Sequence, residues 1–502
     1  MVTAPHFVEL LEVLGGIEPM LIDSRKHWNL YTVRFRTPAG EMTANYLYLA
    51  ADCPYGEANA VNLSTWRKHG PYTVVTTTKS RLSRDLVRTA EEFGGRTATT
   101  PKKLLVENVL QSVQASKPDG DDFRYFIEPE LNYSDSLTLG KPPIPALTHF
   151  VKILVEDGRS NVDGVCAEIL LAPAGQGKTT LCRAIANKIR LTNPDIIPVL
   201  VESSQWQQLL ELTLSNVLNA ALLQMIPGAT HLTNPRVFQM LVRESILVPI
   251  FDGFDELSLH PNANFSAATL LEELVELVGG AEARILVTAR DAFWDRHFNS
   301  IPETVAQKIQ LCKLQGFSNN QRRQFFQKRL NLPEERDIAN RLSREIGSRL
   351  YEGAVNRPTM QADRASGVPL MLELIALYVD GNPSATFVPE SRDPLGPLLE
   401  SVCERENERQ KLDISAQKQM LIFENLFRDY PDEIPREYLV LYVEDAVTGV
   451  TQDILGRFES HAFLTIGSIG NVAPRFETLR VYFVARWLAN QLAGFILDGQ
   501  VR

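Results

Sequence analysis

The chain has 502 residues, which is enough for about three domains of ordinary size. Hydrophobic residues make up 44% and charged residues 22% of the sequence, and these globular proportions exclude a fully disordered or fibrous protein. The 51 basic residues are outnumbered by 61 acidic ones, which gives a net charge of -10. That balance argues against a protein that coats nucleic acid through an overall positive field, although a local basic patch stays open.

Residues 1–115 are expected to form a small α+β or α/β domain. A helical pattern over residues 7–14 is followed by alternating and β-branched runs that are typical of strands. The expected strands are residues 31–35, 46–49 and 72–76, and the expected helices are residues 82–93 and 102–113. The stretch SKPDGDD that follows has the composition of a linker.

The segment 72–95 faintly resembles the later half of restriction-endonuclease-like domains, in which a helix follows such a strand. A nuclease of that kind holds Mg²⁺ with an Asp and a Glu-x-Lys on adjacent strands, and the earlier strands contain no Glu-x-Lys or Asp-x-Lys. We therefore expect an interaction or effector domain rather than an active nuclease. The basic residues near this helix are Lys79, Arg81, Arg84 and Arg88. They fit either a solvated helix face or a contact with nucleic acid, so nucleic-acid binding is left open.

Five apolar runs alternate with helical patterns in the next part of the chain. They are residues 167–171, 197–201, 246–251, 284–289 and 308–314. Continuous apolar strands separated by helices predict a parallel sheet that is covered by helices on both faces. The expected fold class is therefore α/β.

The first of these runs leads into the loop APAGQGKTTL, residues 172–181, which opens a helix. A strand, a glycine loop and a helix in this order form a P-loop, whose backbone N–H groups surround a phosphate. The residues assigned to nucleotide binding are Ala174, Gly175, Gln176, Gly177, Lys178, Thr179 and Thr180. Lys178 reaches the β- and γ-phosphates, and the Thr179 hydroxyl ligates Mg²⁺. Ala172 replaces the usual first glycine, which costs little because the two later glycines keep the tight turn.

The third run ends in the sequence DGFDEL, residues 252–257. A carboxylate at the end of a buried strand beside the P-loop strand holds Mg²⁺, which assigns Asp252 to the metal together with Thr179. Many ATPases place the catalytic base directly after this aspartate, but here that position is glycine. Asp255 and Glu256 follow shortly after, and we expect one of them to orient the attacking water. The alternative is that the pair is an acidic cluster at a helix start.

The fourth run contains Thr288 near its end and is followed by Arg290. Ligands of such sheets lie at the carboxyl ends of the strands, so Thr288 and Arg290 are placed to sense the γ-phosphate. A surface salt bridge is the alternative role for Arg290. Further along, GVPL at residues 367–370 suits a helix that opens with proline in its first turn, a weak signal by itself.

The sequence DGFDEL resembles the Walker B box of NACHT-type NTPases, within the STAND group of signalling ATPases. Residues 367–370 resemble the family box whose proline, here Pro369, contacts the nucleotide. The other similar segments, in family order, are residues 172–181 (Walker A), 288–290 (sensor tip), 314–318 (entry to the helical domain) and 476–489 (end of the winged-helix region). The last segment has no histidine, so a nucleotide-sensing histidine is not carried over. The resemblance covers about two-thirds of the chain, residues 145–490.

The resemblance implies a P-loop NTPase sheet that is followed by a helical domain and a winged-helix-like domain. The expected boundaries are 1–115 for the N-terminal domain, 116–144 for a linker, 145–315 for the nucleotide-binding domain, 316–385 for the helical domain, 386–490 for the winged-helix-like domain and 491–502 for a tail.

The resemblance also implies a molecular switch that uses ATP, ADP and Mg²⁺. A trigger lets ATP replace ADP in a closed monomer, which opens and assembles into a homo-oligomer that turns on the N-terminal domains. Hydrolysis is slow and regulatory, with Asp255, Glu256 and Arg290 as its catalytic residues. Bacterial members often serve in defence against phage, so the expected trigger is a phage protein or a separate sensor chain. The five widely spaced cysteines, the absence of a secretory pattern at the start and the absence of a long apolar run favour a cytoplasmic protein without a membrane span.

Two other classes of protein stay open. A DNA-directed AAA+-like ATPase or restriction-type subunit, with a degenerate nuclease-like N-terminal domain, also carries a P-loop. Such a motor needs an arginine finger, for which Arg322 and Arg323 are candidates outside any recognisable box. A binding module with an inactive nucleotide site is the third possibility, which the intact lysine, threonine and aspartate of the site disfavour.

Overall fold

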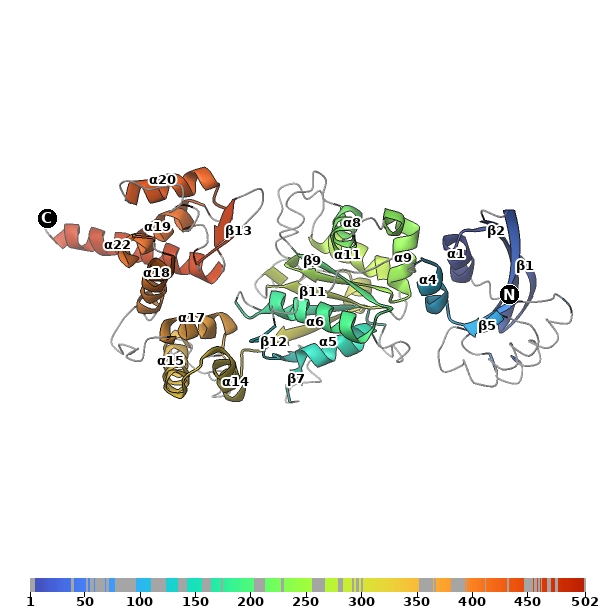
Figure 1. Ribbon diagram of the computed structural model, residues 1–502, viewed down its shortest axis with the longest axis horizontal. Coiled ribbons are helices and arrows are strands. Elements are labelled where there is room, and N and C mark those ends of the chain that lie inside the picture. Colours follow the sequence, from blue (N-terminus) through green and yellow to red (C-terminus); the bar gives the residue numbers. More distant parts are fainter. Residues whose placement is uncertain are drawn as a thin grey trace.

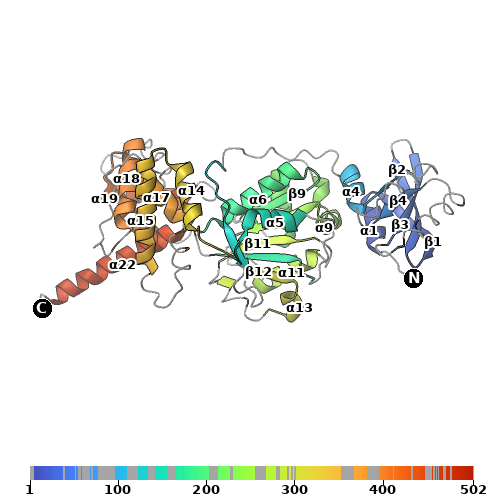
Figure 2. The ribbon, with the colours of Figure 1, turned by 90° about the horizontal axis from the view of Figure 1, so that it is seen from below.

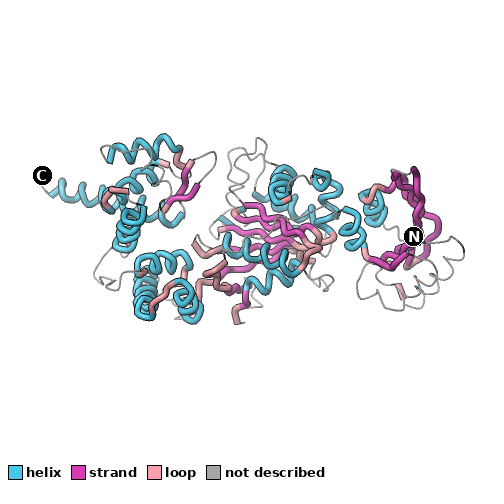
Figure 3. Tube along the Cα trace, viewed as in Figure 1, coloured by secondary structure: helices cyan, strands magenta, loops and turns pink. Residues whose placement is uncertain are grey.

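The structure of the protein is a computed structural model, drawn in Figure 1. The described residues are 5–37, 40–50, 53–54, 58, 68, 72–76, 96–109, 123–133, 142–155, 164–172, 175–202, 213–226, 230–254, 267–278, 283–290, 293–294, 298, 301–351, 364, 367–380, 393, 395–410, 412–430, 433–446, 455, 458, 461, 463–466, 471–474 and 477–500. They form an elongated molecule, with strands gathered at one end and in the middle and a mainly helical region at the other end (Figure 3).

Five strands form the N-terminal sheet, in the order β1-β2-β3-β4-β5. The elements are α1 (Pro5–Val13), β1 (Gly16–Arg25), β2 (Trp28–Thr37), β3 (Gly40–Leu49), β4 (Thr73–Thr76), β5 (Arg96–Thr99) and α4 (Pro101–Val109). The first three strands are antiparallel, and β4 and β5 continue the sheet in parallel with β3. Helix α1 buries Phe7, Leu10 and Leu11 in one cluster with Tyr31 and Val33 of β2, as its apolar spacing requires.

Several N-terminal elements agree with the predictions. The helix expected over residues 7–14 is α1. The strands expected over 31–35 and 46–49 lie within β2 and β3, and the strand expected over 72–76 corresponds to β4, which begins one residue later. Strand β1 was not predicted, because its sequence GIEPMLIDSR contains proline and lacks regular alternation, features that an edge strand tolerates. The helix expected over 82–93 and its four basic residues lie outside the described residues, and the helix expected over 102–113 is described as far as Val109.

The central sheet has seven strands in the order β7-β6-β12-β8-β11-β10-β9. The strands are β6 (Glu130–Tyr133), β7 (Ile144–Pro145), β8 (Ala167–Leu171), β9 (Ile197–Glu202), β10 (Leu247–Asp252), β11 (Ile285–Ala289) and β12 (Ile309–Leu314). All five strands that the apolar runs predicted are present, and they pair in parallel as β12-β8-β11-β10-β9. Their carboxyl ends therefore share one edge, which is where parallel sheets bind ligands.

Helices cover both faces of this sheet, as predicted (Figure 1). The helices around it are α5 (Ala146–Val155), α6 (Lys178–Thr192), α8 (Leu214–Met225), the 3-10 helix η3 (Thr230–Thr233), α9 (Pro235–Arg243), α11 (Ala267–Val278) and α13 (Glu303–Ala306). Alternate strand residues point to opposite faces, so Val248 and Ile250 of β10 join the cluster of α5 and α6, whereas Leu247 and Phe251 join the cluster of α8, α9 and α11. This double burial explains why the strands are apolar throughout.

The sheet extends into the range expected as a linker, 116–144. Strand β6 pairs antiparallel with β12, and β7 pairs antiparallel with β6. The residues just before β6 pack against the C-terminal region, because Ile127 lies in the same apolar cluster as Phe317 and Phe326. A four-residue strand, ELNY, carries too little periodicity to be predicted, and its partner strand lies far along the sequence.

The C-terminal region is helical, with one small hairpin. Its elements are α14 (Asn319–Arg329), α15 (Pro333–Tyr351), α17 (Pro369–Val379), α18 (Gly396–Gln410), α19 (Ala416–Asp429), α20 (Arg436–Ala446), β13 (Leu464–Ile466), β14 (Val472–Pro474) and α22 (Glu477–Gln500). Strands β13 and β14 pair antiparallel and lie between α20 and α22 in the chain. Figure 2 shows α22 running away from the body, at the end opposite to the N-terminal sheet. In the described part of the chain, no helix is long and apolar enough to cross a membrane.

Candidate nucleotide-binding site

The predicted P-loop lies at the carboxyl edge of the central sheet. Strand β8 is buried along its whole length and delivers the chain to the loop, and α6 begins at Lys178. Gly175 and Gly177 have φ angles of 78° and 84°, a left-handed conformation that favours glycine. No side chain caps the start of α6, so its first N–H groups face the loop as a ready site for an anion. Ala174 lies outside the described residues.

The two functional side chains of the loop take different directions. Lys178 is half-buried, and its ammonium donates a 2.7 Å hydrogen bond to the carbonyl oxygen of Ala172, where β8 ends. Thr179 and Thr180 are exposed, and the Thr179 hydroxyl lies near the carboxylate of Asp252, whose pKa it lowers. The structure thus brings the lysine, the threonine and the aspartate together at the first turn of α6.

Asp252 is buried at the end of β10, with 6% of its surface exposed. The Thr288 hydroxyl donates a 2.7 Å hydrogen bond to its Oδ1 atom and accepts one of 3.1 Å from the backbone N–H of Gly253. Burial raises the pKa of Asp252, and the hydrogen bonds from Thr179 and Thr288 act against this rise by stabilising the charged form. Thr288 therefore holds the carboxylate in place from the neighbouring strand β11.

The strand order corrects one expectation about this carboxylate. Asp252 was expected on a strand beside the P-loop strand, but β11 lies between β8 and β10. Sequence does not reveal the order of parallel strands, because each strand is equally apolar. Asp252 still reaches the P-loop, since α6 lies across this face of the sheet and brings Thr179 to it.

The donor set fits a magnesium ion. A hydroxyl and a carboxylate are hard oxygen ligands, which Mg²⁺ prefers, and it usually keeps water and phosphate oxygens as its remaining ligands. Thr179 lies close enough to Asp252 to lower the pKa of that carboxyl group, so the two oxygens lie on the same side of the loop. The loop also contains a buried oxygen, Gln176 Oε1, that has no hydrogen-bond partner. Polar groups of this kind are expected where a polar ligand completes the site.

The predicted catalytic residues are placed only in part. Arg290 is half-buried and follows β11 at the carboxyl edge, two residues after Thr288. Asp255 and Glu256 lie outside the described residues, so the assignment of the water-orienting carboxylate stays a prediction. Arg322, a candidate arginine finger, is 1% exposed in α14 and cannot reach a neighbouring molecule without rearrangement.

The GVPL segment lies directly against the P-loop. Helix α17 begins at Pro369, and the backbone N–H of Leu370 donates a hydrogen bond to the carbonyl oxygen of Gly175 at 3.2 Å. A Cβ atom built on Gly177 would lie 3.9 Å from Cγ of Pro369. The segment is anchored on its other side, where the N–H of Phe317 donates to the carbonyl oxygen of Gly367 at 2.7 Å. The C-terminal region is thus joined to the nucleotide edge through backbone contacts.

Sequence reasoning missed one acidic residue at this edge. Glu202 ends β9 and is the register partner of Asp252 on β10. Its Oε1 atom accepts a 2.6 Å hydrogen bond from Nε of Arg183 on α6. The available signal was the same one that identified Asp252, namely a carboxylate directly after an apolar run.

A second polar cluster lies at the opposite end of β8. Glu168, with 1% of its side chain exposed, pairs with Arg284 at 2.6 Å and accepts a hydrogen bond from the Cys312 thiol at 3.6 Å. Nearby, Tyr133 and Nε2 of His149 are hydrogen-bonded at 2.7 Å. Among the described residues no group of three or more His, Cys, Asp or Glu side chains could hold a metal. We assign this cluster to the packing of β6, β8, β11, β12 and α5.

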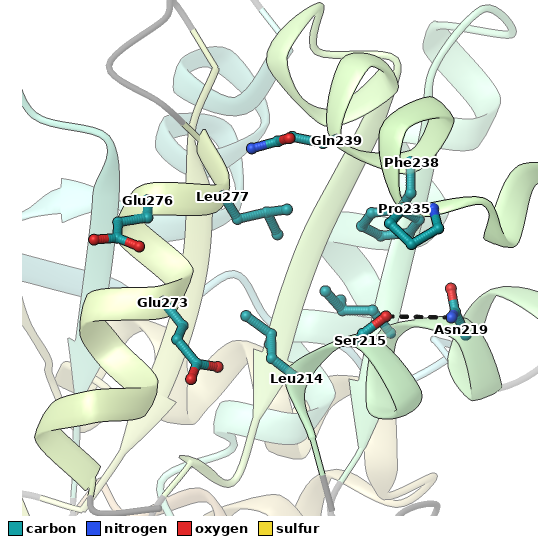
Figure 4. Close-up of a pocket in the computed structure, with 10 residues that line it drawn as sticks. Leu214, Ser215, Asn219, Pro235, Phe238, Gln239, Glu273, Glu276 and Leu277 are labelled. Atoms are coloured by element: carbon teal, nitrogen blue, oxygen red, sulfur yellow. Dashed lines mark hydrogen bonds between the residues drawn. The ribbon is translucent and has the colours of Figure 1, made fainter. Parts of the chain in front are cut away.

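A separate hollow of about 320 Å³ lies between α8, α9 and α11 (Figure 4). Leu214 and Leu277 line it, with Pro235 and Phe238 on the α9 side and Glu273 on the α11 side. Asn219 Nδ2 donates a 3.5 Å hydrogen bond to Oγ of Ser215. None of the predicted site residues lines it, so this hollow is distinct from the P-loop edge.

The parallel sheet, the glycine loop at the start of α6 and the buried aspartate define a P-loop NTPase fold with a nucleotide-binding edge. Within the chain, residues 169–333 match the NACHT domain, a P-loop NTPase domain. This range begins inside β8 and ends at the start of α15, so it contains the P-loop, Asp252 and Thr288.

Two solved structures are similar to the chain at low sequence identity. The Aeropyrum pernix ORC2 protein, solved as ADPNP-ADP complexes, is 13% identical, with a TM-score of 0.30 and coverage of 74% of this chain and 99% of that chain. C. elegans PCH-2 is 14% identical, with a TM-score of 0.22 and coverage of 52% of this chain and 66% of that chain. At such TM-scores nothing about function is transferred from either structure. Among curated proteins, none matches the chain.

Proposed function

We propose that this protein is an ATP-binding, slowly hydrolysing switch of the NACHT and STAND type, which oligomerises on activation and turns on its N-terminal domain. The contact between Leu370 of α17 and Gly175 of the P-loop carries the proposal. Because this contact is made by the nucleotide loop itself, a change in the loop is transmitted to the C-terminal region. A switch needs such a coupling, since a ligand shifts an equilibrium only by binding two states differently.

The residues of the site have separate roles in this proposal. The N–H groups at the start of α6 and the ammonium of Lys178 bind the phosphates, for which Lys178 leaves the carbonyl of Ala172. Thr179 and Asp252 hold Mg²⁺, which neutralises phosphate charge when bound. Thr288 fixes the Asp252 carboxylate, and Pro369 packs against the nucleotide from the α17 side.

The remaining catalytic roles follow the sequence predictions. Arg290 contacts the γ-phosphate, and Asp255 or Glu256 orients the attacking water. Ala174, Gly175, Gln176, Gly177 and Thr180 complete the nucleotide contacts.

The biological setting of the proposal comes from the NACHT resemblance. The switch serves in bacterial antiviral defence, and its trigger is a phage protein or a separate sensor chain. A cytoplasmic location is in keeping with five cysteines that are all buried and unpaired with one another. Challenge of bacteria that express the wild-type or the K178A chain with a phage panel tests this setting. Equal plating on both strains would contradict the defence role.

The first experiment is mass photometry of the purified protein with ADP, with ATP, and with ATP and the K178A variant. Discrete higher oligomers that form with ATP alone and disappear in K178A are the expected result. The matched control is K188A, because Lys188 is exposed on the same helix almost three turns further along. Oligomers that form equally without nucleotide would contradict a nucleotide-dependent switch.

Turnover separates the switch from the DNA-directed alternative. A switch is expected to hydrolyse ATP slowly and without stimulation by DNA, whereas a motor is stimulated by DNA. Of the two candidate arginine fingers, Arg322 is buried, whereas Arg323 is exposed on α14, so turnover has to decide between the two classes. Strong stimulation of wild-type ATPase by duplex DNA would favour the motor instead.

A further inference from the structure

Glu202 and Asp252 project from neighbouring strands toward the same helix. They are register partners in the parallel β9–β10 pair, and register partners point to the same face of a sheet. The face is set by the residues two positions earlier, since Ile250 and Leu200 both pack in the cluster that contains α6. Both carboxylates therefore lie on the α6 face at the carboxyl edge, where the P-loop helix begins.

Glu202 is largely shielded from solvent and is already engaged by a cation. Its side chain is 17% exposed, and Arg183, which donates to it at 2.6 Å, is 48% exposed. Arg183 lies one turn beyond Thr179 on α6. The Arg183–Glu202 ion pair thus connects α6, which carries the expected ligand Thr179, to β9, which lies beside the strand of Asp252.

The charge of Glu202 acts on the metal-binding carboxylate. The two carboxylates are direct register partners on adjacent strands, so their charges lie side by side on the same face of the sheet. Two anionic groups that repel each other beside a loop built for phosphate are stabilised by a shared cation. In the structure Arg183 supplies that cation for Glu202.

We propose that Glu202 is a positioning residue of the magnesium site. Its carboxylate binds water molecules held by Mg²⁺, and Arg183 competes with these water molecules for the carboxylate. The proposal rests on the proposed nucleotide-binding function. Mg²⁺ bound at a nucleotide site usually keeps several water ligands, and carboxylates in hydrogen-bonding range orient such ligands. Glu202 needs no direct bond to the metal, in contrast to Thr179 and Asp252.

The proposal predicts opposite effects for the two members of one ion pair. E202Q removes the anion and should lower the affinity for Mg²⁺ by about tenfold, the loss that is usual for supporting groups of metal sites. R183Q frees the anion and should raise this affinity by about twofold to fivefold, because partly exposed ion pairs are weak. E202D keeps the charge and should retain more of the metal affinity than E202Q. If the pair served only to hold α6 on β9, both removals would act in the same direction.

The test is a fluorescence titration of mant-ADP binding over a series of Mg²⁺ concentrations, which needs no turnover. The measured quantity is the Mg²⁺ concentration at which half of the strengthening of nucleotide binding is reached. The matched control is E424Q, since Glu424 also forms a carboxylate–arginine pair, with Arg486 at 2.7 Å in the C-terminal region, and is even less exposed than Glu202 (7% against 17%). Thermal unfolding of each variant without nucleotide shows whether it is folded.

The outcomes separate this inference from the proposed function. A rise of the half-point in E202Q, a fall in R183Q and no change in E424Q support the inference. Equal half-points in all variants, or a loss of ATP turnover in E202Q with an unchanged half-point, overturn it while the function stands. If wild-type protein binds no mant-ADP, or binds it without any effect of Mg²⁺, the proposed function fails and the inference with it.

Discussion

The backbone N–H of Leu370 donates a hydrogen bond to the carbonyl oxygen of Gly175, with a nitrogen–oxygen distance of 3.2 Å. The first N–H groups of a helix have no acceptor within the helix, and here the P-loop supplies an acceptor for one of these groups. Leu370 is also buried, with 4% of its surface exposed, so the contact has an apolar part. The start of α17 and the shape of the loop therefore depend on each other.

Substitution of Gly175 by alanine should disrupt this contact. A Cβ atom at this position would lie 3.0 Å from Cβ and Cδ2 of Leu370, and the φ angle of 78° adds backbone strain of about 1–2 kcal/mol. We expect G175A to lower the melting temperature and to weaken mant-ADP binding by at least about tenfold, the equivalent of about 1.4 kcal/mol.

The control for G175A is G164A. Gly164 also has a positive φ angle, of 67°, but a Cβ atom there would meet nothing within 4 Å. G164A should therefore show the loss of stability from strain alone, with unchanged mant-ADP affinity. Equal nucleotide affinity of G175A and wild type would contradict the role given to the contact.

Thr288 should matter for both stability and turnover. T288V preserves the shape of the side chain but removes the hydrogen bond to Asp252 and leaves the N–H of Gly253 without its acceptor. The expected loss of unfolding free energy is about 2 kcal/mol, as for other buried bonds to a charged group. ATP turnover should fall with it. T288S keeps the hydroxyl and should retain more turnover than T288V, and the reverse order would exclude this role.

Removal of Arg284 should leave a buried charge without its partner. Glu168 has 1% of its side chain exposed, and loss of one member of a buried pair costs about 3–5 kcal/mol. We expect R284A to lower the melting temperature strongly at pH 8. The double variant E168Q/R284A removes both charges and should be more stable than R284A. A double variant that is less stable than R284A would show that the charge of Glu168 is not the cause.

The loss of stability caused by R284A should depend on pH. Burial raises the pKa of Glu168, and Arg284 acts against this rise, so the pKa is higher still without Arg284. A carboxyl group whose pKa is raised in the folded state stabilises the fold at low pH and loses this contribution as the pH rises above its unfolded value of 4.5. The difference between R284A and wild type should therefore be smaller at pH 5 than at pH 8. Melting temperatures at both values measure it.

His149 should make the fold sensitive to acid. Burial, with smaller contributions from Arg284 and Lys152, lowers the pKa of His149 from 6.5 to about 4. The unfolded chain then binds a proton before the folded one does, so stability falls as the pH drops from 6.5 towards 4. H149Q should show a smaller fall of melting temperature over this window. Y133F removes the partner hydroxyl but keeps the imidazole, so it should retain the slope of the wild type.

The sequence alone was sufficient for the parts of the fold that depend on local pattern. The five strands β8 to β12 were predicted within a residue or two, because a strand buried on both faces must be apolar along its length. The loop that contains Lys178 and the carboxylate of Asp252 follow the carboxyl ends of such strands, where parallel sheets bind their ligands. Helix α1 followed from its apolar spacing in the same way.

The tertiary structure decided what depends on partners that are distant in the chain. The strand order, which separates β8 from β10, the addition of β6 to the edge of β12 and the contact of Leu370 with Gly175 leave no local signature. Only the register of β9 with β10 shows that Glu202 lies next to Asp252. Periodicity tells which face of an element is buried, but not which element covers it, because apolar contacts are not directional. Hence the sequence determined the chemistry of the nucleotide edge, and the packing of the elements determined which residues share it.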